Sequence, residues 1–154
     1  MKLTPRLLRF GLNLYGPYLG AGVRINHISQ DWRETRVSLK LHWYNRNAMG
    51  THFGGSLYSM VDPHLALLLM NLLGDSYIVW DKSAHIKFVR PIKGPVHAVM
   101  RIEEEDEKRI KAETEAGAKY LPEFEIRIDD EEGNLVAVVR KVLYVRKKRP
   151  APAE

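Results

Sequence analysis

The feature that most constrains this 154-residue sequence is one long apolar segment, residues 56–73, set between glycines. Gly54 and Gly55 precede it and Gly74 follows it, which predicts a single helix of about 20 residues, roughly 30 Å long. From Leu65 onward the segment is apolar almost all round, so the helix must be buried on nearly every side. Most of the remaining chain must therefore wrap around it.

Most other patterns indicate strands. Residues 33–43 alternate between apolar and polar side chains, as a half-buried strand does. Similar patterns predict strands at 77–80, 84–90, 96–102, 109–116, 123–128 and 135–146, with an acidic turn at 103–107. Consecutive strands joined by short turns imply an antiparallel sheet. The expected fold class is therefore α+β, with an antiparallel sheet wrapped around a long central helix.

A shorter helix is predicted at residues 4–16, where Thr4 can cap the N-terminus and Pro5 takes the first helical position. We favour a helix packed on the domain. A membrane-surface helix is the alternative, because this segment carries Lys2, Arg6 and Arg9. We expect one domain over residues 1–154, with this extra helix within residues 1–20 and a basic, disordered tail at 147–154.

The net charge of +5 lies at the two ends of the chain. Residues 1–10 and 146–154 each carry +3, whereas residues 11–145 carry −1. A nucleic-acid-binding domain usually has a basic face on its folded body, so we expect no nucleic-acid partner. The absence of cysteine excludes disulfides and thiol catalysis. The six scattered histidines lack metal-binding spacing, so no metal site is predicted.

No secretory signal or membrane-spanning segment is predicted. The first residues lack an apolar run followed by a cleavage site. The longest apolar stretch, residues 65–73, is far shorter than the roughly 20 residues that a bilayer requires. We therefore expect a cytoplasmic protein with no stable membrane insertion.

Residues 47–62, NAMGTHFGGSLYSMVD, hold the strongest candidates for chemistry. Gly54 and Gly55 lie where a loop becomes a helix, where the first amides have no partner within the helix. Such amides can bind an oxyanion, and glycines let a substrate approach the backbone closely. Asp62 follows two turns later on an apolar helix, where a carboxylate is costly unless it is paired or functional. The segment thus offers an oxyanion hole and an acid, base or nucleophile.

These residues also allow simpler interpretations. Gly54 and Gly55 could form only a tight turn, and Asp62 could lie on an exposed stripe or pair with a basic residue in a dimer interface. Pro63 adds a further expectation, because proline cannot donate a hydrogen bond to the carbonyl of Ser59. We therefore predict a kink that presents the Asp62 carboxylate to a cleft.

The segment resembles the active-site signature of hotdog-fold acyl-CoA thioesterases, the phenylacetyl-CoA type in particular, approximately N-x-x-x-x-x-H-G-G-x-L-x-S-L-x-D. The positions in register are Asn47, Gly54, Gly55, Leu57, Ser59 and Asp62. Residues 85–91, HIKFVRP, resemble the strand of this family that ends in an arginine-proline corner, and residues 13–25 resemble a less characterised hotdog branch. The resemblance covers about residues 20–146 and implies a hotdog fold.

The resemblance also implies roles for individual residues. Asp62 would act as general base or nucleophile at the thioester carbonyl. The N–H of Gly54, with that of Gly55, would polarise the carbonyl oxygen, and Asn47 would orient the attacking water or the substrate. The substrate would be an acyl-CoA, with no separate cofactor.

Further expectations concern the coenzyme A end and the assembly. Arg90 and Lys93 are candidates for binding the coenzyme A phosphates. Because hotdog sites generally lie between two subunits, the resemblance implies a homodimer or a homotetramer.

This sequence departs from the signature at one position. Phe53 replaces the histidine before the glycine pair, and His52 lies one residue early, so His52 cannot simply take its place. We expect both residues to contact the substrate. The missing histidine keeps open a non-catalytic module that binds acyl-CoA or a partner, and it makes a dehydratase the weaker third option.

Overall fold

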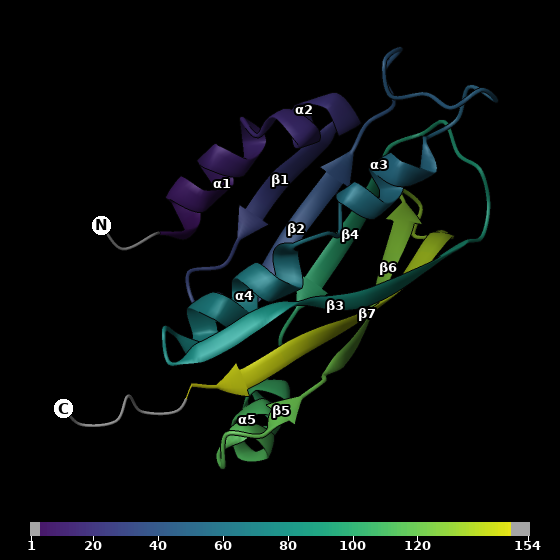
Figure 1. Cartoon of the computed structure of the whole chain (residues 1–154). Coiled ribbons are helices and arrows are strands. Elements are labelled where there is room, and N and C mark those ends of the chain that lie inside the picture. The colour runs from purple at the N-terminus through teal and green to yellow at the C-terminus, as the bar shows by residue number, and fades with distance from the viewer. Residues whose placement is uncertain (1–3, 149–154) are drawn as a thin grey trace.

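The computed structural model describes residues 4–148. Five helices and seven strands follow one another in the order α1 (Pro5–Asn13), α2 (Gly16–Ala21), β1 (Val23–Ile28), β2 (Glu34–Leu39), α3 (Gly54–Ser59), α4 (His64–Leu73), β3 (Tyr77–Phe88), β4 (Val96–Arg101), α5 (Glu104–Thr114), β5 (Lys119–Tyr120), β6 (Glu123–Asp130) and β7 (Leu135–Lys147). One antiparallel sheet has the order β1-β2-β4-β6-β7-β3, and β5 pairs with β7. The sheet curves around α3 and α4 (Figure 1). The predicted α+β class, with a sheet around a central helix and an extra N-terminal helix, is confirmed.

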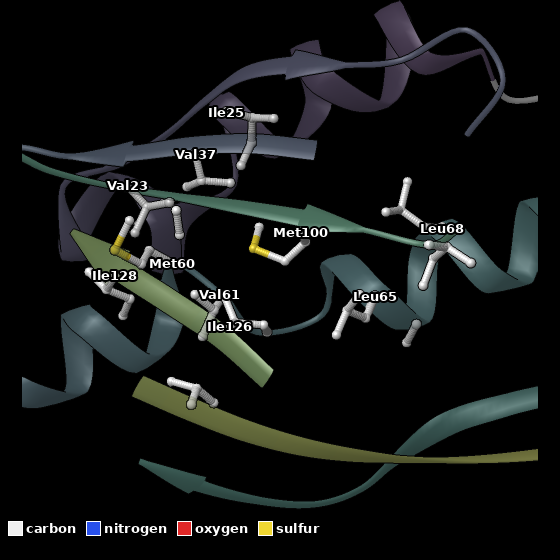
Figure 2. Close-up of a cluster of buried hydrophobic side chains, with 14 of the residues drawn as sticks. Val23, Ile25, Val37, Met60, Val61, Leu65, Leu68, Met100, Ile126 and Ile128 are labelled. Atoms are coloured by element: carbon white, nitrogen blue, oxygen red, sulfur yellow. The ribbon is translucent and has the colours of Figure 1, made fainter. Parts of the chain in front are cut away.

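The central helix is interrupted by residues 60–63, which separate α3 from α4. Pro63 cannot donate to the carbonyl of Ser59, and α3 ends at Ser59. The predicted distortion is therefore present, as a short break at residues 60–63 across which the Asp62 N–H still donates to the Tyr58 carbonyl. Met60 and Val61 from the break point into the core beside Leu65 of α4 and side chains of the sheet (Figure 2).

The segment Gly54–Leu73 is long and apolar enough to cross a membrane by composition alone. In the structure most of its apolar side chains instead fill the core, although Met70 is half exposed. Met60, Val61, Leu65, Leu68 and Leu69 are all buried. The segment is thus the core helix of a folded domain.

The predictions for residues 103–116 are wrong. The expected acidic turn and the strand at 109–116 are together one helix, α5, from Glu104 to Thr114. Glu103 and Asp106 form a reciprocal capping box, and the four acidic residues of the first turn lie at the positive end of the helix dipole. Only Ile110 and Thr114 are buried, so the helix is stabilised mainly by its charges and its cap.

Several other boundaries differ from the predictions. The expected strands at 77–80 and 84–90 are one strand, β3, with a bulge between Asp81 and Ser83. The strand expected at 33–43 is the shorter β2, and β1 and α2 were not predicted. Lys147, placed in the tail, belongs to β7, where it pairs with Glu115. Residues 149–154 of that tail, like residues 1–3, lie outside the described chain.

The two edges of the sheet are finished differently. At β1, the side chain of Asn13 donates from Nδ2 to the carbonyl of Ile25 at 3.0 Å and accepts from the Ile25 N–H at 2.8 Å. This amide takes the place of a neighbouring strand at that point. β3 is the other edge and pairs only with β7 within the described sheet.

Candidate functional site

A pocket of about 320 Å³ opens at the N-terminus of α3. It lies between the loop that enters α3 and the segment that leaves β3. Its lining residues are Asn47, Met49, Thr51, His52, Gly54, Leu57, Phe88, Val89, Arg90, Pro91 and Ile92. The pocket therefore combines an apolar wall with the backbone of Gly54, the first residue of the glycine pair.

The glycines leave two backbone donors open. Within residues 4–148, neither the Gly54 nor the Gly55 N–H has a hydrogen-bond acceptor. A Cβ at Gly54 would lie 2.9 Å from Cζ of Phe88, and one at Gly55 would lie 2.4 Å from Cε1 of Phe53. A larger residue at either position would therefore have to displace the exposed ring of Phe88 or Phe53. Two unused amides beside a pocket can stabilise a developing oxyanion.

Asn47 uses its side chain to shape the loop. Its Nδ2 donates to Oγ1 of Thr51 at 2.8 Å and to the carbonyl of His52 at 3.0 Å. Its Oδ1 accepts from the N–H groups of Met49 and Thr51. Asn47 does line the pocket, as expected for a site residue, but its amide is engaged within the loop.

His52 and Phe53 occupy different environments. His52 is buried and lines the pocket, with Nε2 2.8 Å from the carbonyl of Gly94. Burial lowers the pKa of His52, so the ring is neutral near pH 7. Its Nδ1 is buried without a partner in the described residues. Phe53 is exposed and does not line the pocket, so the structure brings only His52 into it.

Arg90 and Lys93, the two candidates for binding phosphate, lie in different surroundings. Arg90 lines the pocket, yet its guanidinium binds the carboxylate of Asp130 and the carbonyl of Leu135. It thereby ties the end of β3 to the turn between β6 and β7. Lys93 is exposed, just beyond the pocket residues Pro91 and Ile92. Lys93 therefore remains the more available of the two for a phosphate.

Asp62 lies in the break between α3 and α4, with its side chain 43% exposed. Nζ of Lys141 donates to Asp62 Oδ1 at 2.8 Å, and the Tyr58 hydroxyl donates to the same oxygen at 3.2 Å. Burial and the Asp62 charge raise the pKa of Tyr58 to about 12, so its hydroxyl stays protonated. Oδ2 has no hydrogen-bond partner among the described residues. One carboxylate oxygen is fixed while the other is free to accept a proton.

Lys141 is the residue at this site that the sequence reasoning missed. Its side chain is fully buried on β7 and also pairs with Asp81 Oδ2 of β3, at 3.1 Å. Burial raises the pKa of Asp81, while the charge of Lys141 opposes that shift. A signal was present, because Val139, Lys141 and Leu143 alternate along β7 and put a lysine at a core position.

A second polar layer holds the backbone of Asp62. The Tyr18 hydroxyl of α2 lies 3.1 Å from the Asp62 carbonyl and 3.1 Å from Nε2 of His64. Because a hydroxyl has one proton, it can donate to the carbonyl while it accepts from Nε2–H. Burial, with a smaller effect of Lys141, lowers the pKa of His64 to about 3, so this ring is neutral.

Gly54 and Asp62 of one chain do not line the same pocket. Asp62 comes eight residues after Gly54, beyond the end of α3 at Ser59. Asp62 is also absent from the lining of the Gly54 pocket. A reacting carbonyl must lie about 3 Å from both an oxyanion donor and its base or nucleophile.

Comparisons with known proteins agree with this architecture. A family model described as "Domain of unknown function (DUF4442)" matches residues 4–145. A search of curated proteins finds no match.

Three solved structures illustrate the likeness in fold. PA5026 of Pseudomonas aeruginosa, described as a probable thioesterase, is 22% identical, with a TM-score of 0.79 over 96% of this chain and 98% of that one. A Chlorobaculum tepidum protein of unknown function is 18% identical, with a TM-score of 0.73 over 95% and 98%. The thioesterase HI1161 of Haemophilus influenzae is 15% identical, with a TM-score of 0.68 over 99% and 97%. The likeness shows that this chain has the hotdog fold.

Proposed function

We propose that this chain, which belongs to the DUF4442 family, hydrolyses the thioester bond of an acyl-CoA. The observation that carries the proposal is the state of the Asp62 carboxylate, with Oδ1 held by Lys141 and Tyr58 and Oδ2 open. A carboxylate fixed in this way is oriented for proton transfer. The names of two structural neighbours, a probable thioesterase and a thioesterase, support the same reaction.

The steps follow from these groups. Asp62 Oδ2 accepts a proton as water attacks the thioester carbonyl carbon. The carbonyl oxygen gains negative charge, which the N–H groups of Gly54 and Gly55 stabilise. The carbon–sulfur bond then breaks, and the sulfur leaves as a thiol with the proton returned by Asp62. Direct attack by Asp62, through an anhydride that water hydrolyses, uses the same residues.

We also propose that the working unit is a homodimer or a homotetramer with shared sites. The separation of Gly54 and Asp62 within one chain supports this, because one carbonyl needs both groups. The open edge of β3 supports it too, since an unpaired strand can accept a second copy. Each site would then combine the glycine amides of one protomer with Asp62 of its partner.

The pocket supports an apolar acyl group next to the glycine amides. Leu57, Phe88 and Ile92 line its wall, and Met49 lies at the loop side. Lys93 would attract the phosphates of coenzyme A from beyond this wall. The protein requires no other cofactor in this scheme.

Mixing two inactive variants tests the proposal and the shared site together. Asp62→Asn should lower kcat by about 10²–10⁴ on a panel of acyl-CoAs. Gly54→Val fills the pocket and should also abolish turnover. When equal amounts are refolded together, half of the dimers contain one copy of each variant, and each of these has one intact site of two. Activity should therefore return to about a quarter of wild type. Unchanged turnover in Asp62→Asn would overturn the mechanism, and failure to recover on mixing would overturn the shared site.

A binding module without catalysis is the second candidate. The engagement of the Asn47 amide within its own loop favours it, because that amide is then not free to orient water. Tight binding of acyl-CoA to the wild-type protein by calorimetry, with no release of thiol, would support this alternative over hydrolysis.

A further inference from the structure

The N-terminal helices expose a large apolar surface. α1 packs on the core through Pro5, Leu8 and Leu12. Its opposite side carries Leu7, Phe10 and Leu14, which fall within about 60° of one another on the helix. Phe10 and Leu14 are 64% and 60% exposed. The apolar surface of α1 therefore extends from the side that the domain covers onto an exposed side, and Arg6 and Arg9 lie on the remaining polar side.

The apolar surface continues from α1 onto α2. Tyr15 and Leu19 are both more than half exposed. The two helices lie together alongside β1, at one side of the molecule (Figure 1). We call the exposed side chains Leu7, Phe10, Leu14, Tyr15 and Leu19 the N-terminal apolar face.

The segment that carries this face has charged side chains of one sign only. Residues 1–30 contain no aspartate or glutamate, and the first acidic residue is Asp31. Arg6, Arg9 and Arg24 lie in the described part of this segment, and none has a carboxylate within 4.0 Å among residues 4–148. Exposed apolar side chains beside unpaired guanidinium groups match an anionic amphiphile.

One hollow on this surface is lined by both apolar side chains and arginines. It has a volume of about 330 Å³ between α1 and β1, and its lining includes Phe10 and Leu14 together with Arg9 and Arg24. The guanidinium of Arg9 is held in place there by a 3.0 Å hydrogen bond to the carbonyl of Asn26. The hollow can thus place a phosphate beside the two arginines and an acyl chain beside the apolar side chains.

A second copy of the chain fits this face poorly. Two-fold contact between identical surfaces would bring Arg6, Arg9 and Arg24 of one protomer against the same residues of its partner. Like charges at a contact oppose association. A bilayer with anionic headgroups supplies the opposite charge instead.

We propose that the N-terminal apolar face and its arginines adsorb to the surface of bilayers that contain anionic phospholipids. α1 is the helix that lies in the interface, with Phe10 and Leu14 in the headgroup region and the arginines on the phosphates. The core helices remain folded within the domain. This peripheral binding is independent of thioester hydrolysis.

Co-sedimentation with lipid vesicles tests the proposal. The full chain should pellet with vesicles of phosphatidylcholine containing about 30 mol% phosphatidylserine, should not pellet with phosphatidylcholine alone, and should be released by added salt. Arg6→Gln with Arg24→Gln should weaken this partitioning about 25-fold, since each charge contributes about fivefold. Phe10→Ser should weaken it about tenfold or more.

Matched controls lie elsewhere on the surface. Lys108→Gln with Arg109→Gln removes two exposed charges from α5, and Leu121→Ser removes an exposed leucine. Both should partition like wild type. The proposal is overturned if the chain ignores anionic vesicles, if both vesicle types bind it equally, or if the controls match the test variants. A lower mass of Phe10→Ser in light scattering would also overturn it, because the face would then bind a second copy.

Discussion

Nζ of Lys141 lies 2.8 Å from Oδ1 of Asp62, although 79 residues separate the two in sequence. The lysine is completely buried, and its second partner is Asp81. A buried ammonium is tolerated only when it is paired, so the site and the core depend on the same three side chains.

Removing the Lys141 amine should lower both stability and activity. Adding a second substitution, at Asp81, should restore stability without restoring activity. Lys141→Met leaves two carboxylates without their cation and should lower the free energy of unfolding by about 3–5 kcal/mol. Adding Asp81→Asn removes one of these charges and should restore much of that loss in urea titrations.

The activity of the Lys141→Met, Asp81→Asn double variant should not recover with its stability. The double variant still lacks the group that fixes Asp62 Oδ1, so kcat should stay low while KM changes little. Asp81→Asn alone keeps Lys141 and serves as the control. Full recovery of kcat in the stabilised double variant would show that Lys141 only supports the fold.

Gly54 should be replaceable only if Phe88 gives way. Gly54→Ala places a Cβ 2.9 Å from the Phe88 ring, so the ring must move into the pocket. We expect KM for acyl-CoA to rise severalfold. Phe88→Leu should relieve the contact, and a double-mutant cycle on kcat/KM should give a coupling of about 1 kcal/mol. Additive effects would contradict the close contact.

Buried His64 should make stability depend on pH. Its pKa is lowered to about 3 in the folded chain, against 6.5 for an ordinary histidine. Between these values the unfolded chain binds one more proton, so the free energy of unfolding falls as the pH is lowered below 6.5. Urea titrations at pH 7 and pH 5 should differ by about 2 kcal/mol from this residue.

Two variants isolate that effect. His64→Gln can still bond to Tyr18 but cannot take up a proton, so the difference between the two pH values should shrink. His85→Gln changes an exposed histidine and should leave it unaltered. An identical pH dependence in His64→Gln and wild type would assign the titration to other groups.

Arg90 and Lys93 should differ in what they affect. Arg90→Gln removes the pairing with Asp130. Because the Arg90 side chain is partly exposed, this loss should lower the free energy of unfolding by only about 1 kcal/mol. Lys93→Gln should leave stability unchanged and raise KM for acyl-CoA severalfold at low salt only. If Arg90→Gln instead raises KM with normal melting, the phosphate role belongs to Arg90.

The sequence allowed the central helix, its break and most of the sheet to be predicted, because glycine, proline and alternating side chains act locally. α5 was missed for the opposite reason. Ile110, Ala112 and Thr114 alternate with charged residues, which imitates a strand, although Glu103 and Asp106 form a helix cap. β1 was missed because its alternation is short and is broken by the bulge between Ile25 and His27.

Some residues of the candidate site could be predicted from local sequence and others could not. Gly54, Gly55 and Asp62 stand out because each is unusual in its own segment. The alternation along β7 marks Lys141 as a core lysine, but its partners Asp62 and Asp81 come from elements distant in sequence and meet it only in the folded sheet. The departures from the resembled signature at Phe53 and His52 place an exposed ring outside the pocket and a neutral imidazole within it.

The amide of Asn13 on Ile25 has a consequence for growth of the sheet. Because the Asn13 side chain blocks β1 at Ile25, β3 is the long edge of the described sheet that is open to backbone hydrogen bonds from another copy. When two β3 edges pair across a two-fold axis, neither edge remains open. Association through β3 therefore ends at a dimer and does not continue into a fibre. Asn13→Ala would reopen the second edge, and the variant should form open-ended polymers that light scattering detects.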